Sequence, residues 1–92
     1  MQEVPLDQTV RRADVLWRRV GDRVLIRRRG DDELVVLAGT GVALWDALSE
    51  GATVDTLVAA LAEAHDASPA AVGPDVQVAV ASLIDQRVVE PT

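Results

Sequence analysis

The segment from Leu34 to His65 constrains the fold more than any other part of the chain, because it joins a short strand to two helices. Its first four residues are apolar and lie between acidic residues and a Gly-Thr-Gly turn, which predicts a strand. Apolar residues then recur at helical spacing from Thr40, a candidate cap, to about Ser49. Thr53 caps a second helix, which ends near His65. Two helices joined by about four residues pack as a corner.

Two further strands are predicted before this segment. Residues 14–20 alternate between two faces and end at Gly21-Asp22, a two-residue turn in which glycine supplies the positive φ. Residues 23–29 then return as a second strand, with Val24 and Ile26 directed inward. After a second, acidic turn, the Leu-Val-Val-Leu strand forms one edge of an antiparallel meander in the order 1-2-3.

A third helix is predicted from Pro74 to about Gln86, after a loop over residues 64–72. Proline favours the first turn of a helix, and the carboxylate of Asp75 favours the N-terminal end of the helix dipole. One apolar arc of this helix forms the predicted core face, namely Val76, Ala79, Val80, Leu83 and Ile84. Residues 88–90 are expected to be extended. Three strands followed by three helices predict a small α+β domain of winged-helix type.

The composition predicts one soluble domain. Ninety-two residues with 49% hydrophobic content can bury a modest core, and residues 1–12 are expected to form a flexible lead-in. The chain does not begin with a basic segment followed by an apolar run, and no window approaches the length of a membrane span. Without cysteine the chain has no disulfide and no thiolate metal site, which fits a reducing compartment. We therefore expect a cytoplasmic monomer or weak dimer that does not bind membranes.

Several motifs in this order also occur together in one known family. They are a strand, a helix that carries a Trp, a Gly-x-Thr hinge, a helix of the type Val-x-x-Leu-Val-x-x-Leu, and an Asp-Val pair in the third helix. The pattern resembles the PqqD family over roughly residues 14–90. Matching residue types occur at Leu37, Trp45, Gly51, Thr53, Leu57, Leu61, Asp75, Val76 and Leu83. Two positions depart from it, because Ala38 replaces a frequent Asn and His65 replaces a common Tyr.

Members of the PqqD family are RiPP recognition elements, small peptide-binding domains of ribosomal natural-product pathways. The resemblance implies that residues 13–92 form a PqqD-like peptide-binding domain. In relatives the leader of a precursor peptide lies as an added strand between the third strand and the third helix. The resemblance therefore implies two partners, a leader peptide and a separate modifying enzyme or leader peptidase.

Two apolar features of the chain exceed what a core requires. The strand over residues 34–37 is apolar on both faces, so either other segments cover both faces or its edge is open to accept a strand. Val78 lies opposite the core face of the third helix, where it is either an ordinary exposed valine or part of a groove wall. The candidate peptide-binding residues are Leu34, Val35, Val36, Leu37, Val78, Ala81, Ser82 and Asp85.

Charge divides the chain into two parts. Residues 11–29 contain eight Arg and two acids, whereas from Gly39 onward Arg87 is the only cation against eight acids. All nine cations are Arg, which either reflects only a GC-rich genome or places guanidinium groups opposite carboxylates of a partner or of this domain. The candidate electrostatic contacts are Arg18, Arg23, Arg27 and Arg29.

The sequence gives little support to catalysis or to a cofactor. His65 is the only histidine and continues the apolar stripe of the second helix, so we expect a half-buried structural residue and not a general base. No acidic cluster has the alternating spacing of a calcium loop, and no lysine accompanies the Gly-Thr-Gly turn to bind phosphate. We therefore expect no enzymatic activity, no metal and no cofactor.

DNA binding is the main alternative, together with a role as a protein scaffold, because winged helices often read DNA through the third helix. Here that helix would carry Asp75, Asp85 and a single Arg87, so it would repel phosphates. We therefore expect no nucleic-acid partner, and favour binding of a leader peptide by strand addition.

Overall fold

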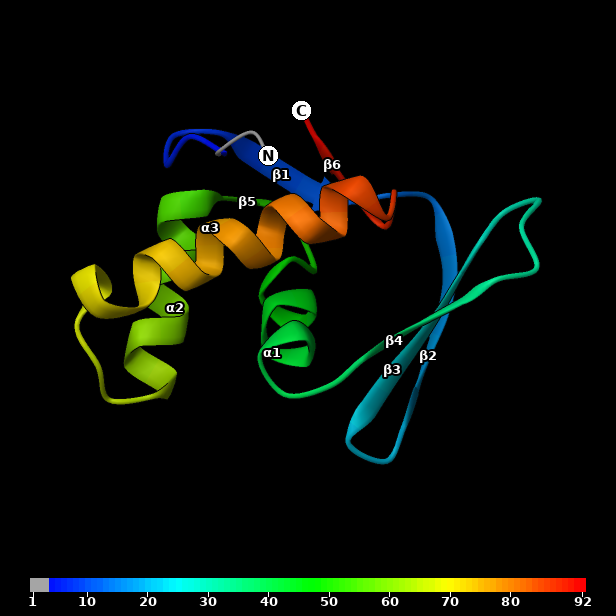
Figure 1. Ribbon diagram of the computed structural model, residues 1–92, viewed down its shortest axis with the longest axis horizontal. Coiled ribbons are helices and arrows are strands. Elements are labelled where there is room, and N and C mark those ends of the chain that lie inside the picture. The colour runs from blue at the N-terminus through cyan, green and yellow to red at the C-terminus, as the bar shows by residue number, and fades with distance from the viewer. Residues whose placement is uncertain (1–3) are drawn as a thin grey trace.

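The computed structural model describes residues 4–92, which form three helices and two three-stranded antiparallel sheets (Figure 1). The elements in chain order are β1 (Thr9–Arg12), β2 (Val15–Val20), β3 (Arg23–Arg28), β4 (Leu34–Leu37), α1 (Thr40–Ala47), β5 (Ala52–Thr53), α2 (Val54–Ala64), α3 (Pro69–Asp85) and β6 (Val89–Pro91). The α+β class is therefore confirmed. The expected order of strands and then helices holds only in part, because β5 and β6 lie among and after the helices, and a winged-helix fold is not confirmed.

The predicted meander is the sheet β2-β3-β4. Val20 pairs with Arg23 across the Gly21-Asp22 turn, and Gly21 has a φ of 60°, which glycine adopts without the cost of a Cβ. Val24 and Ile26 are fully buried, as their alternation predicts. β3 is the central strand of this sheet, and β2 and β4 are its two edge strands.

The second sheet, β5-β1-β6, brings together segments from the two ends of the chain and from the helix connection (Figure 1). Val10 in β1 is fully buried and pairs with Ala52 on one side and Pro91 on the other. Residues 9–12, assigned from sequence to the flexible lead-in, are thus a central strand, while residues 1–3 of that lead-in lie outside the described residues. The lead-in prediction was wrong for β1 because its hydrogen-bonding partners lie more than 40 residues away in the sequence.

The first two helices differ from the prediction in one cap. The N-cap of α1 is Gly39, with a φ of 55°, and not Thr40, so no side chain caps this helix. The Oγ1 of Thr53 accepts a hydrogen bond from the amide of Thr56 at 3.1 Å, which confirms the predicted cap of α2.

The third helix begins five residues earlier than predicted, at Pro69. Ser68 caps it by accepting a hydrogen bond from the amide of Ala71 at 3.2 Å, and Pro69 occupies the first helical position. Pro74 therefore lies inside α3 and leaves the carbonyl of Ala70 without its helical donor. Both residues are exposed, so water can hydrate that carbonyl.

The core lies where α3 crosses the other two helices and meets the inner faces of both sheets (Figure 1). Trp45 of α1 is its largest fully buried side chain. The predicted core face of α3 is correct for Val76, Val80 and Leu83, which are buried, and Ala79 and Ile84 pack against them while partly exposed.

Arg12 lies between the two tryptophans of the chain. Its guanidinium carbon is 4.8 Å from the ring centroid of Trp17 and 4.7 Å from that of Trp45, and the two rings meet edge to face at 5.7 Å. Its Nε and Nη2 donate to the carbonyl oxygen of Trp45 at 3.0 and 2.6 Å. Burial lowers the pKa of Arg12, Asp46 raises it and Arg19 lowers it, but the group stays charged at neutral pH. Arg12 therefore joins β1 to α1 and β2.

Replacing Arg12 by Lys should lower the free energy of unfolding by about 1–2 kcal/mol, because an ammonium group keeps the charge but loses the planar two-donor contact. Arg11→Lys is the matched control, since Arg11 lies on the exposed side of β1 and pairs with Glu90; it should cost less than about 0.5 kcal/mol. Urea unfolding of the three proteins measures both values. Equal losses would mean that the contact of Arg12 with the indoles adds no stability.

Candidate functional site

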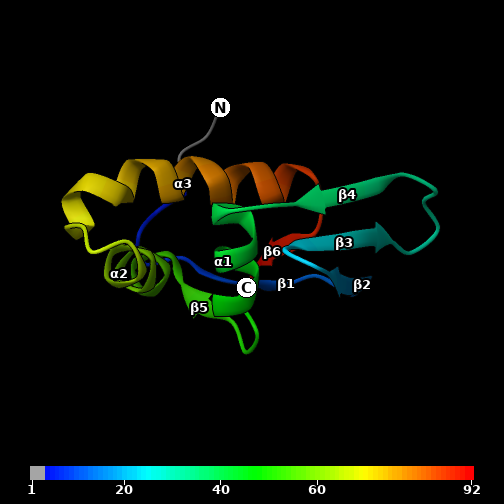
Figure 2. The same cartoon turned by 90° about the horizontal axis from the view of Figure 1, so that it is seen from below.

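The strand β4 has one face in the core and one face in solvent. Val35 and Leu37 are 8% and 7% exposed, whereas Leu34 and Val36 are 53% and 51% exposed. The last turns of α3 lie beside this strand (Figure 2). Between them is an open groove of about 360 Å³, lined by Arg28, Glu33, Leu34, Val35, Val36, Asp85, Gln86 and Arg87. Of the two readings left open for this strand, coverage of both faces is therefore wrong.

The register of the sheet indicates which amides of β4 are directed to its open edge. Val20 and Arg23 close a two-residue turn, where the carbonyl of the first residue accepts from the amide of the fourth. Hydrogen-bonded and non-hydrogen-bonded pairs alternate along antiparallel ladders, which predicts a hydrogen-bonded pair between Ile26 and Val35. The next residue, Val36, then directs its N–H and C=O away from β3.

The helical side of the groove is formed by one face of α3. Asp85 lines the groove, and Val78 and Ser82, at i−7 and i−3, lie on the same helix face. Val78 is 58% exposed, and Ser82 accepts hydrogen bonds from the side-chain amide of Gln86. Ala81 is 7% exposed and belongs to the core. The structure thus brings Leu34, Val35, Val36 and Asp85 together, extends the wall toward Val78, and places Leu37 and Ala81 inside.

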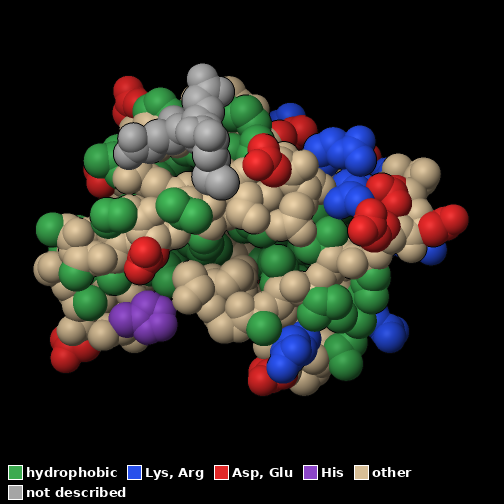
Figure 3. Space-filling view, viewed as in Figure 1, with side chains coloured by type: hydrophobic (Ala, Val, Ile, Leu, Met, Phe, Trp, Pro, Cys, Tyr) green, Lys and Arg blue, Asp and Glu red, His purple; other side chains and the backbone are tan. Residues whose placement is uncertain are grey.

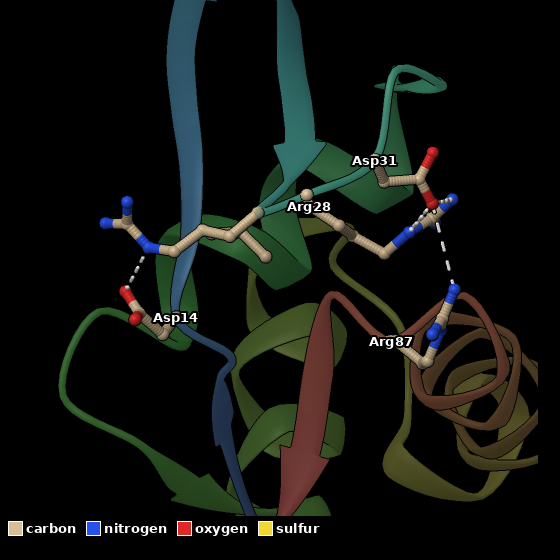
Figure 4. A pocket seen from close by; sticks show the side chains of 7 residues that line it. Asp14, Arg28, Asp31 and Arg87 are labelled. Atoms are coloured by element: carbon tan, nitrogen blue, oxygen red, sulfur yellow. Dashed lines mark hydrogen bonds and ion pairs between the residues drawn. The ribbon is translucent and has the colours of Figure 1, made fainter.

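One end of the groove is charged and was not predicted. Arg28 donates to the backbone oxygen of Gln86 at 2.7 Å and to Oδ2 of Asp31 from Nε and Nη2 at 3.0 and 2.8 Å. Arg87 approaches the same oxygen of Asp31 at 3.8 Å, so two guanidinium groups converge on one carboxylate (Figure 4). Arg28 follows Ile26 on the inner face of β3, so strand alternation could have directed it toward the helix.

The carboxylate of Asp31 is held in its charged form. The amide of Glu33 donates to its Oδ1 at 2.8 Å and lowers the pKa most, followed by the hydrogen bonds from Arg28, while desolvation partly opposes them. The Coulombic fields of Arg28 and Arg87 lower the pKa further. At every pH above this lowered pKa, the charged Asp31 therefore holds the β3–β4 turn against the end of α3.

The predicted arginine contacts do not form one cluster. Arg18, Arg23 and Arg27 lie on the outer face of the sheet β2-β3-β4, opposite its core face. Arg29 follows the end of β3 and pairs with Asp14 at 3.1 Å. The prediction that Arg23 and Arg27 point outward from the second strand is therefore correct. Arg29 does not share their face because β3 ends at Arg28.

The described residues contain no group of histidine, cysteine and acidic side chains that could hold a metal ion. His65 is the C-cap of α2 and is exposed, so the prediction of a half-buried histidine was wrong. The reason is that the helix ends at Ala64, after which the chain leaves the apolar stripe. Within residues 4–92 no helix is long and apolar enough to cross a membrane.

The fold and the groove define a class, a small α+β domain with an open sheet edge beside a helix. The family model of coenzyme PQQ synthesis protein D (PqqD) matches residues 22–89, and the chain therefore belongs to the PqqD family, a family of RiPP recognition elements. PqqD is a non-catalytic accessory family of peptide-modification biosynthesis, so membership implies a role in PQQ or RiPP biosynthesis. No curated protein and no solved structure matches the chain.

The low pKa of Asp31 predicts a specific acid dependence of stability. Since folding favours its charged form, its contribution is complete above the unfolded pKa of about 3.9 and is lost as pH falls through the lower folded value. Thermal unfolding of Asp31→Asn followed from pH 6 to pH 2 should therefore show a smaller loss of stability than wild type. Asp32→Asn, in the same turn, is the control and should keep the wild-type slope; identical slopes in all three proteins would contradict this role of Asp31.

Proposed function

We propose that the chain binds the leader region of a ribosomally synthesised precursor peptide as an added strand on β4. It then presents the attached core peptide to a separate modifying enzyme or leader peptidase. The open edge of β4 is the observation that carries this proposal, because its neighbouring groove ends on α3 and leaves room for an extended chain. Membership of the PqqD family supports the pathway.

Strand addition fits the two kinds of groups in the groove. Outward main-chain groups of an edge strand supply hydrogen bonds to any peptide sequence, and the surrounding side chains supply the selectivity. In the proposed complex, Val36 pairs with the peptide backbone, and the peptide side chains that point inward lie against the wall formed by Asp85, Ser82 and Val78. Exposed apolar surface at Val78 favours an apolar peptide side chain at that position.

The charged end of the groove favours a polar or acidic residue in the leader. Arg87 is 76% exposed, and its 3.8 Å contact with Asp31 leaves donors of its guanidinium group free for another carboxylate. Arg28 is only 14% exposed and is engaged by Asp31 and Gln86, so it supports the turn. We therefore assign the recognition of acidic leader residues to Arg87.

The direct test is a binding screen of the purified chain against precursor peptides encoded near its gene, by fluorescence anisotropy and isothermal titration calorimetry. At least one leader should bind with one-to-one stoichiometry. Failure of every such peptide to bind would overturn leader recognition.

Val36→Pro should weaken leader binding about tenfold, because proline removes the outward amide donor and places a ring on the open edge. Val36→Ala removes the same exposed side chain but keeps the amide, so its affinity should stay within about threefold of wild type. Circular dichroism and thermal unfolding show whether the proline variant is folded.

The peptide can be tested for the same hydrogen bonds without changing the protein. N-methylation of successive leader amides should weaken binding at alternate positions, because only every second amide faces β4. Equal affinity of Val36→Pro and Val36→Ala, together with uniform tolerance of N-methylation, would contradict strand addition at β4.

Val78→Asp tests the helical wall. A carboxylate that must be desolvated against an apolar peptide side chain should cost about 2 kcal/mol or more, a loss of at least about tenfold in affinity. Val78→Thr has a similar shape without the charge and should bind much closer to wild type. Because Val78 is exposed, both variants should unfold near the wild-type temperature. Unchanged leader affinity of Val78→Asp would confine the site to β4 and the last turn of α3.

A further inference from the structure

The outer face of the sheet β2-β3-β4 has a mixed apolar and basic surface. In one row across the strands, Leu16 lies opposite Arg27 and Arg27 opposite Leu34; in the next, Arg18 lies opposite Leu25 and Leu25 opposite Val36. Arginine therefore alternates with apolar residues along β2 and β3, while β4 contributes only apolar side chains to this face. No acidic residue occupies this face within the three strands.

This face is exposed and slightly hollow. Leu16 and Leu34 are 43% and 53% exposed, Leu25 in the neighbouring row is half-buried, and a shallow hollow of about 560 Å³ is lined by these residues together with Arg18 and Arg27. At the right of Figure 3, hydrophobic side chains are visible at the surface with both basic and acidic side chains around them. Apolar side chains beside one another at a surface indicate an interaction site when charged residues surround them.

Two arginines of this face have no acidic partner in the described structure. Arg11, Arg19, Arg28 and Arg29 each lie within 4 Å of a carboxylate, whereas none of the ion pairs formed by residues 4–92 includes Arg18 or Arg27. Their side chains are exposed between leucines. A guanidinium group surrounded by apolar side chains is a common anchor in protein interfaces, where Arg is enriched and its donors match carboxylates.

We propose that this outer face docks the peptide-modifying enzyme through a patch that combines acidic and apolar side chains, and that the bound leader becomes part of the same face. This inference rests on the proposed function. A strand added to β4 extends the sheet, and every second side chain of that strand points to the face that carries Leu34 and Val36. The enzyme would then contact the sheet and the leader together. The chain with bound leader, the loaded form, therefore binds the enzyme more tightly than the free chain does.

The charge pattern argues against two other occupants. A second copy packed symmetrically on this face would bring more arginines and no strand carboxylate to Arg18 and Arg27, so the two copies would repel one another. Nucleic acid binds mainly through neutralised phosphates, but the chain has a net charge of −6 and its outer face interleaves the basic groups with leucines. An acidic and apolar protein surface complements both components.

The test uses the full chain, its bound precursor peptide and the peptide-modifying enzymes encoded beside its gene, with surface plasmon resonance as the readout. Arg18→Gln with Arg27→Gln should weaken enzyme binding at least about tenfold and leave leader binding within about twofold. Arg11→Gln with Arg19→Gln removes the same charge from paired arginines and should leave enzyme binding near wild type. Leu16→Ser should weaken enzyme binding without changing leader affinity.

Salt and loading provide two further readouts. The association rate of the wild-type chain with the enzyme should fall as salt rises, and the fall should be smaller for the Arg18 and Arg27 double variant. Wild-type chain loaded with leader should bind the enzyme more tightly than free chain. Equal affinity of the free and loaded forms would overturn the shared surface.

The docking face is overturned if the wild-type chain binds none of these enzymes, or if the two double variants bind them equally well. A DNA duplex, or vesicles of equal parts phosphatidylcholine and phosphatidylglycerol, provide the alternative partners. The docking face is also overturned if only one of these binds the wild-type chain and does not bind the Arg18 and Arg27 double variant. Enzyme binding that depends on Arg18 and Arg27 in a chain that binds no leader would support the docking face and overturn leader recognition instead.

Discussion

The position of Arg12 between two indole rings is the interaction on which the arrangement of the two sheets depends. Arg12 is the last residue of β1, and β2 begins three residues later, so the chain passes from one sheet to the other at this point. The side chain contacts Trp17 of β2 and Trp45 of α1. Because Trp45 is fully buried, these contacts set the position of the sheet β2-β3-β4 against the helical core.

A sheet held in this way can leave one strand open without losing its fold. Val35 and Leu37 fix β4 to the core, and the Arg28–Asp31 contact fixes the turn before it, so the strand is positioned although its outer edge is unpaired. A rigid edge costs less conformational entropy when a peptide is added than a mobile one. The open edge, the helical wall and the outer face therefore form three connected surfaces around one fixed strand.

Local pattern predicted much of the fold and half of the candidate groove. Alternation and the Gly21 turn gave the β2-β3-β4 meander, Thr53 gave the start of α2, and apolar period gave the core face of α3, because each depends on neighbours in sequence. Alternation also separated the buried Val35 from the exposed Val36. The wheel of α3 placed Val78 with Asp85 but did not show that Ala81 packs into the core.

By itself, the sequence determined the α+β class, the order of the meander and the two-sided apolar strand at its edge, since these follow from side-chain period and turn chemistry. Only the tertiary structure decided that Val10 lies in a central strand, because β5 and β6 reach β1 from distant parts of the chain. It also decided that Arg28 and Arg87, 59 positions apart, meet at Asp31. Such contacts depend on how elements pack against one another, and no local pattern records them.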